Sequence, residues 1–154
     1  MAVVSNEIEI VHALPADDLF QIITNFHELA PKAAPEIYKS ITVEGEIVVG
    51  TIQSNVYGDG VPFTSSKQKF DVVDLPNRYV SFTIYEGDIL ADYLESITHH
   101  LKILPSADGG SVYKHTIEYK CKGDVKPTEE YLSKAKEGIT GVFKAIEAYV
   151  TANA

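Results

Sequence analysis

The stretch KPTEEYLSKAKEGITGVFKAIEAYVTANA, residues 126–154, decides how the rest of the chain can fold. Its apolar residues recur at spacings of three and four with charged residues between them, which is the pattern of one long amphipathic helix. The apolar positions are Leu132, Ala135, Ile139, Val142, Phe143, Ile146, Tyr149 and Val150. Their burial contributes on the order of 10–20 kcal/mol gross, so the helix needs a large apolar partner.

The beginning of this helix is marked in the sequence, and two glycines interrupt its interior. Pro127 suits a first helical turn, and Glu129 and Glu130 face the positive end of the helix dipole. Gly138 and Gly141 each cost roughly 1 kcal/mol relative to alanine. Either the helix packs closely against a sheet at these glycines, or a space beside it must stay empty.

The composition is that of one globular domain, residues 1–154, with 45% apolar residues. A net charge of −9 with a single arginine, Arg78, disfavours a protein that grips phosphate backbones, so no nucleic-acid partner is expected. The single cysteine, Cys121, cannot form an internal disulfide. We see neither a signal peptide nor a membrane-spanning run, and therefore expect a cytoplasmic protein that does not bind membranes.

The remainder of the chain is predicted to form one strand, two short helices and a run of further strands. Residues 3–12 alternate between inward and outward positions, which suits a half-buried strand. Short helices from Asp17 to near Asn25 and over His27–Ala33 follow. Turn signals then separate six strands, at residues 38–44, 50–57, 62–74, 78–85, 92–104 and 111–121. Short connections make neighbours antiparallel, so the predicted class is α+β, a curved seven-stranded sheet with helices on one face.

Two of the predicted strands turn a histidine toward the long helix. Period-two alternation points His99 inward beside Ile97, and His115 inward beside Tyr113. The turn at 108–110 should bring the two histidines close to opposite one another. Buried polar groups without partners are costly, so water or a ligand in an internal cavity would resolve this polar patch on an apolar wall.

This patch has three interpretations. The two histidines could position a hydroxyl or carbonyl group of a ligand, or act as general acid and base near neutral pH. Alternatively, a tyrosine hydroxyl or a backbone carbonyl satisfies each of them. A metal is not expected, because two histidines without an inward carboxylate or thiolate are too few ligands for zinc. His12, His27 and His100 are predicted to lie elsewhere, and no cofactor is predicted.

Several short sequence motifs occur in this chain in a characteristic order and spacing. They are Ala33-Ala34-Pro35, Val43-Glu44-Gly45, Gly50-Thr51-Ile52, Tyr85-Glu86-Gly87-Asp88, Asp108-Gly109-Gly110-Ser111 and Ala145-Ile146-Glu147-Ala148-Tyr149-Val150. Together they resemble the birch-pollen-allergen superfamily of plants, the pathogenesis-related class 10 proteins and the related major latex proteins, over essentially the whole chain. The resemblance implies a helix-grip fold, in which the sheet wraps the C-terminal helix and encloses a large internal cavity.

The resemblance also implies a range of functions linked to plant defense and specialised metabolism. Family members bind flavonoids, cytokinins, sterols, alkaloids and similar apolar molecules, and a few are cofactor-free enzymes. Three features of this chain depart from the family or from particular members of it. Ile47 and Val48 occupy positions where the glycine-rich loop of the family usually has glycines. This difference disfavours phosphate binding by the loop, and with it ribonuclease activity. The positions that carry the proton chemistry of norcoclaurine synthases correspond to Ser66, Gln68 and Val80, none of which can perform it. The gate and latch loops of the abscisic-acid receptors are absent as well.

The predicted cavity is mostly apolar with a few polar groups, as is usual for small-molecule pockets. Its expected lining is Phe20, Ile23, Tyr57, Ser66, Gln68, Phe70, Val80, Phe82, Leu90, Ile97, His99, Leu101, Tyr113, His115, Ile117, Ala135, Gly138, Ile139 and Val142. Lys136 and the loop 58–62 are candidates for the entrance.

The first functional hypothesis is a monomeric or weakly dimeric protein that binds a small apolar plant metabolite. The alternative is a cofactor-independent cyclase or isomerase acting on an alkaloid or terpenoid intermediate. In that case His99 and His115, with Tyr113, would move a proton while the pocket excludes water. An enzyme should lose most of its rate when either histidine is replaced by alanine, whereas a binding protein should lose only part of its affinity.

Overall fold

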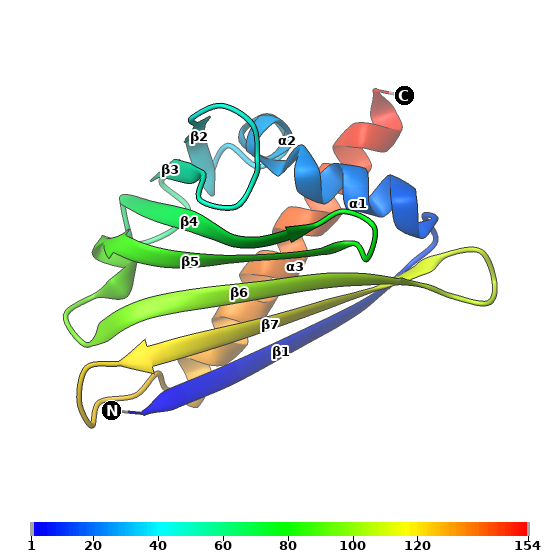
Figure 1. Cartoon of the computed structure of the whole chain (residues 1–154). Coiled ribbons are helices and arrows are strands. Elements are labelled where there is room, and N and C mark those ends of the chain that lie inside the picture. The colour runs from blue at the N-terminus through cyan, green and yellow to red at the C-terminus, as the bar shows by residue number, and fades with distance from the viewer. Residues whose placement is uncertain (1, 154) are drawn as a thin grey trace.

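A computed structural model of the chain describes residues 2–153 (Figure 1). The elements run in the order β1 (Val3–His12), α1 (Ala16–Thr24), α2 (Phe26–Ala33), β2 (Tyr38–Val43), β3 (Ile52–Tyr57), β4 (Ser65–Asp74), β5 (Tyr79–Gly87), the short 3-10 helix η1 (Asp88–Leu90), β6 (Leu94–Pro105), β7 (Ser111–Cys121) and α3 (Glu129–Ala152). The predicted α+β class, with one long C-terminal helix and two short helices, is confirmed.

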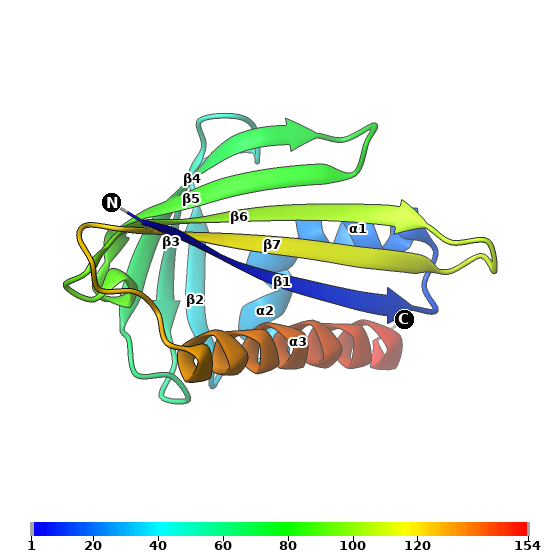
Figure 2. The same cartoon turned by 90° about the horizontal axis from the view of Figure 1, so that it is seen from below.

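All seven strands form one antiparallel sheet in the order β1-β7-β6-β5-β4-β3-β2. The first strand of the chain therefore pairs with the last one, β7, and β2 forms the opposite edge. The sheet curves, so that β2 and β3 turn toward α3 while β1 and β7 run alongside it (Figure 2). The concave face of this sheet is the face that receives the helix.

Helix α3 lies across the concave face and is fixed at its start by a side-chain cap. The Oγ1 atom of Thr128 accepts a hydrogen bond from the Tyr131 backbone N–H at 3.1 Å, which satisfies one of the free amides of the first turn. The C-terminal half of the helix buries Val142, Phe143 and Ile146 against the sheet and α2. The predicted apolar stripe thus packs as expected at this end.

The two helix glycines are not sites of close packing. A Cβ atom placed on Gly138 or Gly141 would meet no atom within 4 Å. Of the two interpretations of these glycines, the structure therefore supports open space beside the helix and not close contact with the sheet.

The elbow of α1 and α2 closes the end of the molecule near the C-terminus (Figure 1). Helix α1 packs on β6 and β7, and α2 packs on β2 and α3. Apolar residues form two buried clusters, one beneath α1, α2 and the end of α3, and another around Ile84, Leu94 and Ile97. Among residues 2–153, no helix is long and apolar enough to cross a membrane.

Four strands begin one to three residues later than predicted, and the largest difference is at β4. Strand β4 was expected to start at residue 62 but starts at Ser65, and the preceding residues form a loop held at both ends. Gly58 donates to the Ile37 carbonyl at 2.9 Å, and Gly60 donates to the Glu36 carbonyl at 2.7 Å. A Cβ on Gly58 would lie 2.4 Å from the Pro35 carbonyl oxygen, so this approach requires glycine.

Candidate ligand pocket

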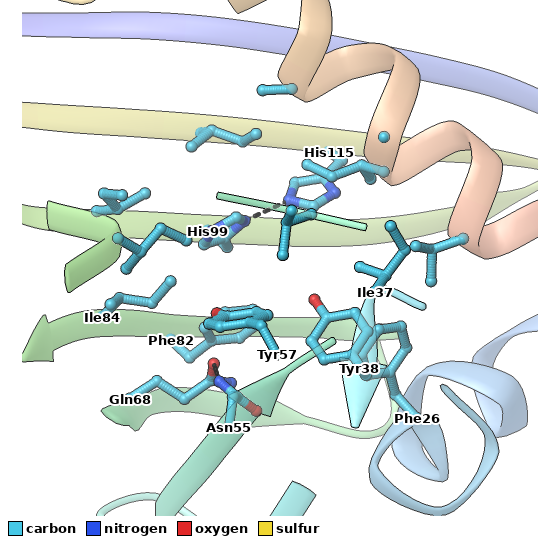
Figure 3. Close-up of a pocket in the computed structure, with 18 of the residues that line it drawn as sticks. Phe26, Ile37, Tyr38, Asn55, Tyr57, Gln68, Phe82, Ile84, His99 and His115 are labelled. Carbon is cyan, nitrogen blue, oxygen red and sulfur yellow. Dashed lines mark hydrogen bonds between the residues drawn. The ribbon is translucent and has the colours of Figure 1, made fainter. Parts of the chain in front are cut away.

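A pocket of about 470 Å³ lies between the concave face of the sheet, α2 and α3 (Figure 3). Its walls are mainly aliphatic and aromatic side chains from β3 to β7. Residues of both buried clusters border it, including Phe70 and Val142 from one and Ile84 and Ile97 from the other. The pocket therefore occupies the space between two packed regions.

Most residues predicted to line a cavity border this pocket. They are Ile23, Tyr57, Gln68, Phe70, Val80, Phe82, Ile97, His99, Leu101, His115, Ile117, Ala135, Gly138, Ile139 and Val142. Their agreement follows from the strand alternation and from the helix periodicity, which point these side chains toward the same interior space.

Phe20, Ser66, Leu90 and Tyr113 were predicted to line the cavity, but they do not border the pocket. Phe20 and Tyr113 belong to the packed cluster beneath α1, and Leu90 belongs to the other cluster. Ser66 points inward but lies behind Tyr57, whose hydroxyl is 2.7 Å from the serine Oγ. For the strand residues Ser66 and Tyr113, alternation gives the direction of the side chain and not its depth. Phe20 and Leu90 lie in the short helices α1 and η1, whose packing against the sheet is a tertiary property.

Other pocket residues were missed. Gln53 and Asn55 precede Tyr57 at intervals of two on the same strand, so strand alternation could have identified them. Ile47 and the loop residues 60–63 come from irregular segments, where the sequence carries no such periodicity. Tyr38 is the first residue of β2, next to an irregularity in the pairing of β2 with β3. The remaining lining residues are Phe26, His27, Ile37, Ile84, Ile89, Tyr119, Tyr131, Lys134 and Phe143. His27, which was expected to lie elsewhere, is therefore at the pocket.

The two inward histidines are joined in a hydrogen-bonded chain. His99 Nδ1 lies 2.8 Å from His115 Nε2, and His115 Nδ1 lies 2.7 Å from the Tyr113 hydroxyl. The predicted near-opposite pairing is wrong in detail, because His115 pairs with Leu101 and His99 pairs with Ile117. The rings still meet across this diagonal, with centroids 5.0 Å apart (Figure 3).

Burial keeps both imidazoles neutral. Loss of solvation lowers the pKa of His99 to about 3, with a smaller contribution from the nearby His100. Burial also lowers the pKa of His115 well below its usual value, and His99 adds to the effect. Burial raises the pKa of the Tyr113 phenol, which stays protonated. The site therefore offers neutral hydrogen-bonding groups and not charges at neutral pH.

A second polar group, the amide cluster of Gln53, Asn55 and Gln68, lies on strands β3 and β4. Gln53 Nε2 donates to Asn55 Oδ1 at 2.9 Å, and Asn55 Nδ2 donates to Gln68 Oε1 at 3.0 Å. Asn55 Nδ2 also donates to Ser66 Oγ at 3.0 Å. Among residues 2–153, the Nε2 atom of Gln68 has no hydrogen-bond partner. The cluster can therefore still donate hydrogen bonds at the pocket wall.

The pocket rim includes Gly60, Val61 and Pro62 of the loop that the sequence suggests as part of the entrance. The helix lysine at the rim is Lys134 and not Lys136, which instead borders a groove between β1 and α3 on the outer surface. Lys134 is exposed and pairs with Glu130 at 3.1 Å, one helical turn away. It is the single permanently charged side chain among the described residues that border the pocket.

The chain matches the Pathogenesis-related protein Bet v 1 family over residues 1–153. It belongs to this family. The predicted relationship to the birch-pollen-allergen superfamily is thereby confirmed. The chain is similar to the root allergen protein of Taraxacum officinale, with 57% identity over 94% of this chain and 93% of that protein's length.

Solved structures of related proteins agree with the observed architecture. The crystal structure of Ara h 8.0201 has a TM-score of 0.83 and 31% identity, and the comparison covers 98% of this chain and 99% of that one. Norcoclaurine synthase from Thalictrum flavum, in complex with dopamine and hydroxybenzaldehyde, has a TM-score of 0.75 and 21% identity over 99% of this chain and 89% of its own. At that identity the second similarity concerns the fold alone. The Bet v 1 relationship supports a fold that binds a hydrophobic ligand.

Proposed function

We propose that this member of the Bet v 1 family binds one small, uncharged, largely apolar plant metabolite in the pocket and releases it unchanged. The observation that carries the proposal is an interior space of about 470 Å³ with apolar walls and a few neutral polar groups. This volume is within the roughly 300–1,000 Å³ that is usual for pockets that hold small molecules.

The charges around the pocket favour an uncharged ligand. Among the described residues that border it, none is an aspartate or glutamate, and Lys134 is at the rim with its partner Glu130. A protonated amine would lose its hydration in the pocket without meeting a carboxylate, which is costly. A terpenoid or a neutral phenolic compound fits these walls better than an alkaloid cation.

The alternative, a cofactor-free cyclase or isomerase, is less well supported. General acid and base catalysis works best when the pKa of the catalytic group lies near the working pH. His99, with a pKa lowered to about 3, is a poor base at neutral pH, and as a neutral ring it is a poor acid. Ser66, Gln68 and Val80 also lack the proton chemistry that the resemblance assigns to norcoclaurine synthases. We therefore favour a binding protein over an enzyme, and we further propose that it is cytoplasmic and a monomer or weak dimer.

The test is to incubate the purified protein with a metabolite extract of plant tissue and identify bound and free compounds by mass spectrometry. A single unchanged compound at about one per chain is the expected result. A product that accumulates well beyond the protein concentration, and that disappears in the variant His99→Ala, would overturn the binding proposal in favour of the enzyme. His100→Ala is the matched control, because His100 is adjacent in sequence and points to the outer face of the sheet, toward Tyr79 and Glu118.

A further inference from the structure

The buried end of the histidine chain is the hydroxyl group of Tyr113. This side chain is 0% exposed, and its single hydrogen-bond partner among residues 2–153 is His115 Nδ1, at 2.7 Å. A phenol has one proton to donate, and a buried donor without an acceptor is more costly than an unused lone pair. The Tyr113 hydroxyl must therefore be the donor in this bond.

The direction of this first bond fixes the direction of the second. Because His115 Nδ1 accepts, the neutral ring of His115 carries its proton on Nε2. That nitrogen lies 2.8 Å from His99 Nδ1 and donates to it. His99 then carries its own proton on Nε2. The reverse orientation would leave the Tyr113 proton without an acceptor in the interior.

The ring of His99 is held in place and its Nε2 atom remains available. The imidazole stacks on Phe82, with ring centroids 4.8 Å apart and an interplanar angle of 19°. Both residues border the pocket. Nε2 has no protein partner among residues 2–153, and it is not sealed off by protein as the unpaired nitrogens of His12 and His27 are. Its N–H bond is therefore open to the pocket space.

We propose that His99 Nε2 is a fixed hydrogen-bond donor that recognises an acceptor oxygen on the ligand. The ligand class is then an uncharged compound with a ketone or lactone carbonyl oxygen. This inference rests on the proposed binding function and names the chemical group that the pocket selects.

The direct test is nitrogen NMR of the imidazole rings in the full-length protein. Nitrogen chemical shifts distinguish a ring that is protonated on Nε2 from one that is protonated on Nδ1. Both His99 and His115 are expected in the Nε2–H form at neutral pH. A His99 ring with its proton on Nδ1 would present a lone pair to the pocket and would overturn the proposal.

The functional test uses two rigid probes, xanthone and xanthene, which share a tricyclic frame and differ by a carbonyl group in place of a methylene. The wild-type protein should bind xanthone more tightly than xanthene by roughly three- to tenfold, the value of one hydrogen bond. His99→Phe should abolish this preference, so that the variant binds the two probes with equal affinity. His99→Gln retains a donor and should keep part of the preference, and His100→Gln should keep all of it.

The outcomes separate this inference from the function on which it rests. Equal affinity of the wild-type protein for the two probes would show a working pocket without a donor and would overturn the inference alone. Failure of both probes and of every extract compound to bind would refute the binding function, and the nitrogen shifts would still decide the orientation of His99.

Discussion

At the scale of single residues, burial of the two inward histidines makes the stability of the fold depend on pH. The pKa of His99 is lowered to about 3 and that of His115 is lowered well below its usual value, whereas both titrate near 6.5 in the unfolded chain. Below pH 6.5 the unfolded chain therefore binds more protons than the folded one. The stabilisation is fully present above pH 6.5 and is lost progressively as the pH falls toward the lowered values.

We predict that the free energy of unfolding decreases as the pH is lowered from 7.5 to 5.0. The slope from each of these histidines should approach about 1.4 kcal/mol per pH unit. His99→Gln should reduce the total slope by about that amount, because glutamine does not titrate. Urea unfolding at a series of pH values measures this, and an unchanged slope in the variant would contradict the assignment.

At the scale of an element, helix α3 carries a matched pair of glycines. Gly138 borders the pocket, Gly141 borders the outer groove with Glu7 and Glu9, and a Cβ atom added to either glycine would have no neighbour within 4 Å. Both positions cost the helix roughly 1 kcal/mol relative to alanine. The cost is equal and both glycines are exposed, but only Gly138 borders the pocket.

We therefore predict that Gly138→Leu places a side chain at the border of the pocket and weakens ligand binding, while the helix gains stability. Gly141→Leu should stabilise the helix by a similar amount, up to about 1 kcal/mol, and leave binding unchanged. Xanthone titration together with thermal unfolding of both variants measures this. Equal loss of binding in the two variants would mean that the effect arises from the helix as a whole and not from the pocket.

The loop at the pocket rim is held by one carboxylate. Asp88 accepts hydrogen bonds from the Thr64 amide at 2.8 and 2.9 Å, the Thr64 hydroxyl at 2.8 Å and the Ser65 amide at 3.0 Å. The Ser65 amide and then Thr64 lower the pKa of Asp88 below its usual value. This contribution is present above the usual aspartate pKa and is lost as the pH falls through the lowered one.

Asp88→Asn should weaken this clamp, because an amide replaces the charged acceptor with a neutral one. We predict faster hydrogen exchange at the Thr64 and Ser65 amides and faster ligand release. Asp59→Asn, in the same loop, is the control and should leave both rates unchanged. If exchange at these amides is the same in Asp88→Asn as in the wild type, Asp88 does not hold the loop.

At the scale of the whole molecule, the sequence predicted the architecture better than the site. The inward face of β5 could be predicted from the alternation of Val80, Phe82 and Ile84, because a half-buried sheet must present one side to the core. The inward face of α3 could be predicted from its helical periodicity. The register that places His115 opposite Leu101 depends on the pairing of two strands and cannot be read from either one. Whether Lys134 or Lys136 lies at the pocket rim depends on how α3 is rotated about its axis against the sheet, which is a tertiary property.

The scarcity of charge around the whole pocket predicts selectivity by ligand charge. Acridone is neutral, whereas 9-aminoacridine has the same frame and is a cation at neutral pH. We expect acridone to bind and to raise the melting temperature. At one hundred times its dissociation constant it should add about 2.7 kcal/mol to the free energy of unfolding. The cation should not bind, because no described lining residue is an acid. Tighter binding of the cation would contradict this account.

The pairing of β1 with β7 has a consequence for synthesis on the ribosome. The first strand to be made finds its partner only after residue 121 has been made, and α3, which covers the concave face, emerges last of all. Until then both edges of β1 are unpaired and the apolar concave face is open. The interior space is therefore completed by the final helix, and a metabolite present during translation meets its walls before they are covered.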